Sequence, residues 1–231
     1  MCSLSDGKED GTADTDRIEA LAAQIAAAMP ELDPALQRAA LTLLRLLALG
    51  EPVTVQRLAD ALALPAADLD ETLERSPGVL RDDQRRIIGF MGLSVAPISE
   101  HRLHVERRSL WAWCAWDTLF LPELLGETAR VSSRCPSTGA AISLSVTPDG
   151  PADLAPRETV VSFLVPEQQF DANVLQSFCH FVHFFASPDA AASWIAEHPG
   201  TFSLSIDDAY RLGKLTNRAS FSAALGESKS A

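Results

Sequence analysis

Apolar residues recur at helical spacing near the start of the chain, within a sequence rich in alanine. One face of a predicted helix over residues 17–29 carries four of them: Ile18, Leu21, Ala22 and Ile25. Thr15 or Asp16 is available as its N-cap, and Pro30 ends it. The pattern therefore predicts one amphipathic helix before residue 33.

The next stretch predicts three more helices and a small hairpin. Asp33 is a suitable N-cap before Pro34 at the first helical position, Thr54 can cap the following helix, and Gly50 closes the first of them. The predicted elements are helices at 34–49, 55–62 and 66–75 and strands at 79–81 and 86–91. Three helices followed by a hairpin are typical of a winged helix.

From about residue 93 short runs rich in Val, Ile, Ser and Thr alternate with helical segments. Strands are predicted at 102–106, 128–133, 141–147, 159–165, 177–186 and 201–206, and helices from Pro188 to Gly200 and from Asp207 onward. This irregular order is typical of an α+β fold. We expect three parts: an acidic extension and helix (1–32), a winged-helix-like module (33–93), and an α+β core (94–231) with a mixed or antiparallel sheet and surrounding helices.

The polar and acidic N-terminus, residues 1–14, is expected to be disordered. It lacks the basic start and apolar centre of a signal peptide. The richest apolar run, residues 39–49, is too short to span a bilayer and contains Arg45. We therefore expect a cytoplasmic protein with no membrane partner.

Charge changes the interpretation of the winged-helix pattern. The chain has 31 acidic and 19 basic residues, a net charge of −12. In a DNA-binding winged helix the third helix enters the major groove, but here that helix carries four acidic residues against Arg75: Asp68, Asp70, Glu71 and Glu74. Like charge facing phosphate is unfavourable, so no nucleic-acid partner is expected.

The segment LWAWCAWDTLFLPELLG, residues 110–126, combines three tryptophans with a thiol and a carboxyl group. If it is helical, Cys114 and Asp117 lie on one face about a turn apart. An apolar wall disfavours the charged form of Asp117, which suits a general acid at neutral pH. Pro122 is expected to kink or end the helix early. We expect Trp111, Trp113 and Trp116 to form that wall.

A second candidate segment is QSFCHFVHFFAS, residues 176–187. As a strand it would place Cys179 and His183 on one face and His180 on the other. His183 is more readily explained as a hydrogen-bonded buried histidine than as a ligand. No CxxC pair occurs among Cys2, Cys114, Cys135 and Cys179, so each is expected to be a free thiol in a reducing compartment.

Two thiols and a carboxyl group leave three hypotheses open. One is a zinc or similar metal site, although structural zinc sites usually show paired CxxC spacing. Another is a cysteine hydrolase in which Cys114 works with a histidine base; the candidates are His101, His104, His180, His183 and His198. The third is a soft-metal site, because thiolates bind soft ions far better than oxygen donors do. Asp117 could then deliver a proton to whatever the metal carries.

Residues 110–147, LWAWCAWDTLFLPELLGETARVSSRCPSTGAAISLSV, resemble the core of the alkylmercury lyase family. The shared pattern is W-C-x-x-D-T-L, then A-R-V-S-S, a cysteine, T-G and a strand. QSFCHFVHFFAS is similar to the second cysteine segment of that family, and the resemblance covers roughly residues 33–215. It implies the family's organisation, a winged-helix-like module before an α+β core.

The resemblance implies roles for four residues. Cys114 and Cys179 match the two mercury-binding cysteines, Asp117 matches the acid that relays the proton, and Cys135 matches a structural cysteine. Three positions depart from the pattern: His180 replaces a further cysteine that is common there, Trp111 stands where tyrosine is common, and Trp116 where an aliphatic residue is common. We expect these three residues and Trp113 to shape the pocket.

The implied reaction is protonolytic cleavage of R–Hg⁺ to a hydrocarbon and Hg²⁺, as part of mercury detoxification. Both cysteines would bind mercury as thiolates, Asp117 would give a proton to the carbon, and Hg²⁺ would stay at these three residues. No organic cofactor is implied, external thiols would release the product, and a mercuric reductase would accept it. The alternative is a non-catalytic soft-metal-binding protein of the same fold, either a chaperone or a metal-responsive regulator.

Overall fold

The computed structural model describes residues 9–227, and its first part consists of four helices. They are α1 (Glu9–Ala28), α2 (Pro34–Leu47), α3 (Val55–Leu62) and α4 (Ala66–Arg75). The caps predicted at Asp33 and Thr54 are confirmed: their side chains accept hydrogen bonds from the backbone N–H three residues later, at 2.9 and 3.1 Å. The N-cap predicted at Thr15 or Asp16 is wrong, because both residues lie inside α1. These bonds satisfy N–H groups that a helix start otherwise leaves without partners.

An eight-stranded antiparallel sheet follows, in the order β1-β2-β3-β5-β4-β6-β7-β8. Its strands are β1 (Val79–Arg81), β2 (Ile87–Phe90), β3 (Leu93–Ser94), β4 (Arg102–Val105), β5 (Arg108–Ala112), β6 (Ala129–Arg134), β7 (Ala141–Thr147) and β8 (Gly150–Ala155). The β1–β2 hairpin, the wing of the winged helix, is not a separate sheet. β3 pairs with β2 on one side and with β5 on the other, so the wing is continuous with the core sheet.

The remaining elements are a second sheet and five helices. The sheet has the order β10-β9-β11, with β9 (Val160–Leu164), β10 (Phe184–Phe185) and β11 (Thr201–Ser205). The helices are α5 (Asp117–Leu125), α6 (Val174–Ser177), α7 (Pro188–Glu197), α8 (Ile206–Ser220) and α9 (Ser222–Glu227), and a 3₁₀ turn spans Cys179–Phe181. Helices outside two antiparallel sheets confirm the predicted α+β class.

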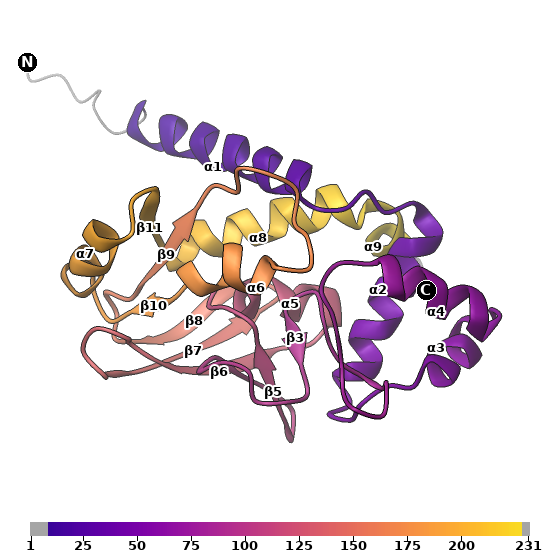
Figure 1. Cartoon of the computed structure of the whole chain (residues 1–231). Coiled ribbons are helices and arrows are strands. Elements are labelled where there is room, and N and C mark those ends of the chain that lie inside the picture. Colours follow the sequence, from indigo (N-terminus) through magenta and orange to yellow (C-terminus); the bar gives the residue numbers. More distant parts are fainter. Residues whose placement is uncertain (1–8, 228–231) are drawn as a thin grey trace, which may run out of the picture.

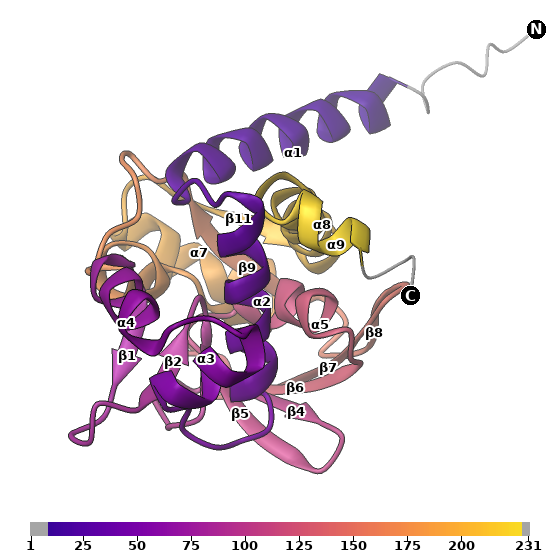
Figure 2. The ribbon, with the colours of Figure 1, turned by 90° about the vertical axis from the view of Figure 1, so that its right-hand side faces the viewer.

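Helix α5 lies at the centre of the fold. Figure 1 shows α1 running along α8, with α2, α3 and α4 gathered at one end of the molecule and α7 at the other. Figure 2 looks onto the end that carries α2, α3 and α4, and it shows α2 beside α5. Buried side chains from both parts, from Ile25 and Leu44 to Leu119 and Leu212, belong to one hydrophobic core. The N-terminal helices therefore form one packed unit with the α+β part.

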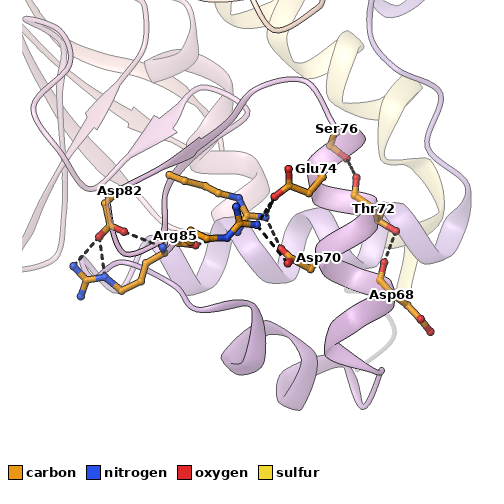
Figure 3. Close-up of polar contacts among 9 residues, drawn as sticks. Asp68, Asp70, Thr72, Glu74, Ser76, Asp82 and Arg85 are labelled. Carbon is orange, nitrogen blue, oxygen red and sulfur yellow. Dashed lines mark hydrogen bonds and ion pairs between the residues drawn. The ribbon is translucent and has the colours of Figure 1, made fainter.

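Ion pairs hold the wing against α4 (Figure 3). The guanidinium of Arg81 donates to Asp70 at 2.8 Å, and that of Arg85 donates to Glu74 at 2.6 Å. Arg81 is the most shielded of the four, with 16% of its side chain exposed. Two basic side chains of the wing are thus paired with acidic residues of α4, where they are less available to phosphate; this adds a physical reason to the expectation that the module does not bind nucleic acid.

Four further local predictions are wrong. Helix α1 begins at Glu9, so residues 9–14 are helical; residues 1–8 of the expected disordered segment, including Cys2, lie outside the described residues. Pro122 lies inside α5, which ends at Leu125 with Gly126 in the left-handed conformation. Strands β3, β5 and β8 were not expected, and Trp111 lies on β5.

The fourth of these wrong predictions is the strand over residues 177–186. The strand there is limited to Phe184–Phe185, and Cys179 lies on the 3₁₀ turn. The Ser162 hydroxyl explains the break, because it donates to the Phe181 carbonyl at 2.7 Å and accepts from the His183 N–H at 2.9 Å. A side chain therefore takes hydrogen bonds that a continuous strand would have given to its neighbour.

No helix among residues 9–227 is long and apolar enough to cross a membrane.

Candidate functional site: two thiols and a buried carboxyl group

A tight turn between β5 and α5 carries the first cysteine. Cys114 lies in this turn, ahead of the helix, and Asp117 is the first residue of α5. The carboxylate of Asp117 folds back and accepts a hydrogen bond from the backbone N–H of Cys114 at 2.8 Å. Thr118 closes the same turn by donating from its hydroxyl to the Ala115 carbonyl at 2.7 Å. The C-x-x-D-T spacing therefore forms a turn that fixes the thiol and the acid together.

The second cysteine reaches this turn from the other side. Cys179 lies on the 3₁₀ turn between α6 and β10. The Ala115 N–H donates to the Val182 carbonyl at 3.1 Å, which joins the two cysteine-bearing segments directly. One ligand atom each from Cys114, Asp117 and Cys179 lies within 4.8 Å of the others, and all three residues are buried. The structure thus brings together the three residues predicted to carry the chemistry.

Burial controls the protonation of this triplet. It raises the pKa of Asp117 to about 7, against an ordinary value of 3.8. Burial also raises the pKa of Cys114 well above its usual value, and the hydrogen bond with Cys179 and the charge of Asp117 add to this shift. For Cys179, the hydrogen bond with Cys114 lowers the pKa, but burial and Asp117 outweigh it and the net shift is upward. All three groups therefore hold protons more tightly than in water.

A cavity of about 120 Å³ opens onto the site. Asp117 and Cys179 line it, whereas Cys114 is fully buried and is not among the lining residues. Most of its wall is apolar: Met29, Phe90, Trp113, Trp116, Phe120, Phe170, Phe178 and Phe221. Trp113 Nε1 and Thr216 Oγ1 are buried without a hydrogen-bond partner among the described residues, and both residues line the cavity.

The predicted pocket residues separate into two groups. Trp113 and Trp116 line the cavity, and Trp116 is anchored by a hydrogen bond from Nε1 to the Ala209 carbonyl at 3.0 Å. Trp111 instead pairs with Ser94 and Arg102 in the sheet, and the exposed His180 projects from the 3₁₀ turn; neither lines the cavity. The expectation that Trp111 and His180 border the pocket is therefore not met.

Cys135 lies apart from the triplet, in the turn between β6 and β7. It is buried, with 1% of its surface exposed. Burial raises the pKa of its thiol, but hydrogen bonds from the Thr138 hydroxyl and from the backbone N–H groups of Ala186, Thr138 and Ser137 outweigh that effect and lower it. The side chain of Cys135 thus ties its own turn to the end of β10.

The histidines do not form the base that a cysteine hydrolase needs. His101 and His104 bond to serine hydroxyls, and His183 and His198 bond to backbone carbonyls. The groups that act on the Cys114 thiol are Cys179 and Asp117. His183 was predicted to be a buried, hydrogen-bonded histidine. The hydrogen bond is confirmed, since its Nε2 lies 2.7 Å from the His180 carbonyl, but the residue is half-buried.

Sequence reasoning missed much of the cavity wall, because it comes from segments far apart in the chain. Met29 follows α1, Gly92 separates β2 from β3, Phe170 lies in the loop before α6, and Thr216 lies on α8. Only Gly92 left a signal, a glycine directly after a predicted strand, where a left-handed residue is often needed.

A buried pair of thiols with a carboxyl group, beneath an apolar cavity, defines a protein of soft-metal chemistry. A family model described as alkylmercury lyase matches residues 93–217, and a model described as the helix-turn-helix domain of alkylmercury lyase matches residues 18–91. The chain belongs to the alkylmercury lyase family.

Individual relatives agree. The chain is 43% identical over 174 residues to an alkylmercury lyase of Pseudomonas putida, covering 75% of this chain and 80% of that one. It is 40% identical over 172 residues to the alkylmercury lyase of Staphylococcus epidermidis, covering 74% and 78%. The crystal structure of the mercury-bound form of MerB2 superposes with a TM-score of 0.69 at 23% identity, covering 88% of this chain and 98% of that one. That likeness shows the fold.

Proposed function

We propose that this protein cleaves the carbon–mercury bond of organomercurials, giving a hydrocarbon and Hg²⁺. The observation that carries this proposal is the triplet itself: two thiols and one carboxyl group within 4.8 Å of one another. Thiolates are the preferred ligands of a soft ion such as mercury. An acid with a pKa near 7 is suited to both taking and giving a proton at neutral pH.

The burial of the two cysteines suggests an order of steps. Cys179 lines the cavity and meets R–Hg–SR′ first, releasing the carrier as HSR′ and forming R–Hg–S(Cys179). Asp117 then takes the proton of the Cys114 thiol, whose sulfur binds the same mercury. The second thiolate pushes electron density toward the carbon, and Asp117 gives that carbon the proton. The hydrocarbon leaves, and Hg²⁺ remains between the two sulfur atoms.

The elevated pKa values of the triplet support this sequence. Before substrate binds, the Cys114 thiol is protonated, so it carries the proton that the product carbon needs. Mercury binding makes its thiolate favourable, because metal ligation requires the deprotonated sulfur. Asp117 can then pass the proton across a short distance inside a site that excludes water. A metal chaperone needs no such acid, which favours the lyase over the non-catalytic alternative.

The cavity suggests which organic groups fit. Its volume is about 120 Å³, and an apolar protein cavity of about 150 Å³ is known to hold benzene. Small alkyl groups therefore fit easily, and a phenyl ring fits with slight widening. Its lining residues include no Lys or Arg, so uncharged organic groups are favoured over those that carry a carboxylate.

Three further expectations stay proposals. External thiols remove Hg²⁺ from the Cys114–Cys179 pair, because free thiolates compete for the same soft ion. A mercuric reductase accepts the released Hg²⁺, and the enzyme works without an organic cofactor in the reducing cytoplasm. The triplet supports the absence of an organic cofactor from this proposal, because it supplies both the metal ligands and the acid.

The test is anaerobic incubation of the protein with phenylmercuric acetate and excess thiol, with benzene measured by gas chromatography. We expect benzene from the wild type and a decrease of about 10²–10⁴-fold for Asp117→Asn, the usual contribution of a positioned acid. Wild-type protein that binds one mercury per chain and releases no benzene would favour the non-catalytic alternative. An Asp117→Asn variant of undiminished rate would remove the acid from the mechanism.

A further inference from the structure

The turn at the end of the wing contacts the catalytic carboxyl group directly. Met91 and Gly92 join β2 to β3, and both have left-handed backbones, with φ of 43° and 92°. A Cβ atom placed on Gly92 would lie 2.7 Å from both Cγ and Oδ1 of Asp117 and 3.1 Å from its Cβ. Real Cβ contacts essentially never fall below 3.0 Å, so the side chain of Asp117 occupies the space that any other residue would need.

Two hydrogen bonds fix the parts on either side of this contact. The Gly92 carbonyl accepts from the Trp113 N–H at 2.8 Å, which ties the wing to the cysteine-bearing turn. On the other side, Oδ2 of Asp117 accepts from the Cys114 N–H at 2.8 Å. The carboxyl group therefore lies between the backbone of Gly92 and the backbone of Cys114.

Buried neighbours and one hydrogen bond hold the carboxyl group beside Gly92. Cys114, Ala115 and Thr118 are completely buried around it, and Asp117 itself is 6% exposed. A shift of the side chain would stretch or break the bond to the Cys114 N–H. Asp117 also lines the cavity, so a Cβ at Gly92 would displace the carboxyl group toward that space at the expense of this bond.

We propose that Gly92 is a positioning residue for the proton transfer: the wing holds the Asp117 carboxyl group against the thiol of Cys114. The proposal rests on the proposed role of Asp117 as the acid. It gives the helix-turn-helix module a part in the reaction, since a residue of its last turn sets the place of the reacting proton. A displacement of about 1 Å in such a group can cost about 10²-fold in rate.

The variant that tests this is Gly92→Ala, and the chain offers a matched control. Gly200 has φ of 90°, almost the same backbone strain, but a Cβ there would meet nothing within 4 Å. We expect Gly92→Ala to lower kcat for phenylmercuric acetate about 10²-fold, with KM changed only a few-fold and one Hg²⁺ still bound per chain. Gly200→Ala should keep the wild-type kcat. An equal kcat in the two variants, each measured per folded molecule, would overturn the proposal.

A double-mutant cycle measures the contact without using activity. Gly92→Ala should lower the unfolding midpoint less when Asp117 is already alanine, because Cγ and Oδ1 are then absent. Shifts that simply add would contradict the proposed contact. If Gly92→Ala alone does not fold, recovery of a folded protein on adding Asp117→Ala would support it, and failure to recover would overturn it. Full activity in Asp117→Asn would instead refute the role of Asp117 as the acid. The double-mutant cycle would still report on the contact between Gly92 and Asp117, because it measures unfolding and not activity.

Discussion

Two turns of this protein each bury a cysteine, and their surroundings are opposite. In the turn after β5, Cys114 faces a second thiol and a carboxyl group in a water-excluding site. In the turn after β6, Cys135 faces a hydroxyl and three backbone N–H donors. The pKa of Cys114 is raised by burial, whereas hydrogen bonds outweigh burial at Cys135 and lower its pKa.

The difference shows that burial alone does not determine what a thiol can do. Donors around Cys135 stabilise the thiolate and make it a fixed hydrogen-bond acceptor that holds β6–β7 to β10. Around Cys114 a hydrogen bond from the Asp117 backbone N–H favours the thiolate, but burial, the Cys179 thiol and the charge of Asp117 outweigh it. A site that must keep a proton and release it only when mercury binds needs an environment like that of Cys114. The following experiments alter one turn at a time.

The largest expected effect comes from exchanging sulfur for oxygen at the triplet. Cys179→Ser should reduce benzene release from phenylmercuric acetate to the background, because a hydroxyl is a poor ligand for a soft ion. The matched change in the other turn, Cys135→Ser, should leave the rate per folded molecule within a few-fold of wild type. Gas chromatography of both variants checks this, and equal losses of rate would contradict the division of roles.

The next effect concerns stability and pH at Asp117. Its pKa is raised from 3.8 to about 7 in the folded protein, so folding favours the protonated form. Ionisation of Asp117 therefore lowers the free energy of unfolding. This loss of stability is absent below pH 3.8, grows as pH rises, and is complete above about pH 7. This interval corresponds to about 4 kcal/mol at about 1.36 kcal/mol per unit. Asp117→Asn should therefore be more stable than wild type at pH 8 and nearly equal near pH 4.

Urea unfolding at both pH values measures that difference. Glu123→Gln is a suitable control, because this carboxyl group is part of the same helix but lies outside the cavity wall. A gain in stability for Asp117→Asn that is the same at pH 4 and pH 8 would show that ionisation of Asp117 is not what costs stability.

The pH dependence of the stability contributed by Cys135 should have the opposite sign to that of Asp117. Its pKa is lowered from 9.0, so the stability it contributes is complete above pH 9 and is lost as pH falls through the folded-state value. The advantage of wild type over Cys135→Ala should therefore increase between pH 7 and pH 9, where the cost of ionising Asp117 is already complete and no longer changes. Denaturant midpoints at three pH values provide the measurement. An advantage that shrinks with pH would mean that the thiolate is not stabilised in this turn.

The smallest expected effect on stability comes from removing one group that donates to Cys135, the Thr138 hydroxyl. Thr138→Val removes the hydroxyl that donates to Cys135 and accepts from the Ala140 N–H at 3.3 Å, and should cost about 2 kcal/mol, at about 1 kcal/mol for each hydrogen bond. Its pH dependence should be weaker than that of wild type, because one of the groups that lower the pKa of Cys135 is lost. Thr147→Val, in the next strand, is the control. The same pH dependence in Thr138→Val and wild type would contradict the assignment of this donor.

Local sequence signals predicted the helices well because their starts are fixed by neighbouring residues. Asp33, Thr54 and Ser187 cap helices as expected. The strand over 177–186 failed because Ser162, far away in the sequence, supplies hydrogen bonds that the pattern could not reveal. The start of α1 at Glu9 was missed because a polar composition was taken to indicate disorder.

At the site, too, local spacing predicted the contacts between neighbouring residues but not those between distant segments. The C-x-x-D-T motif predicted the pairing of Cys114 with Asp117, although as a helix face and not as the turn that the structure shows. The approach of Cys179 was expected only from the family resemblance, because it depends on how two loops pack. The closeness of Gly92 to Asp117 also arises from packing between distant segments, which periodicity and spacing do not encode.

The short strand β3 has a consequence for any attempt to divide this molecule. Its two residues, Leu93 and Ser94, pair with β2 on one side and with β5 on the other. A shortened chain starting after Ser94 would turn β5 into an unprotected sheet edge that includes Leu110 and Trp111. Such edges pair readily with copies of themselves. Strand β3 and the wing behind it therefore also protect β5 against self-association, and we expect the core without them to aggregate.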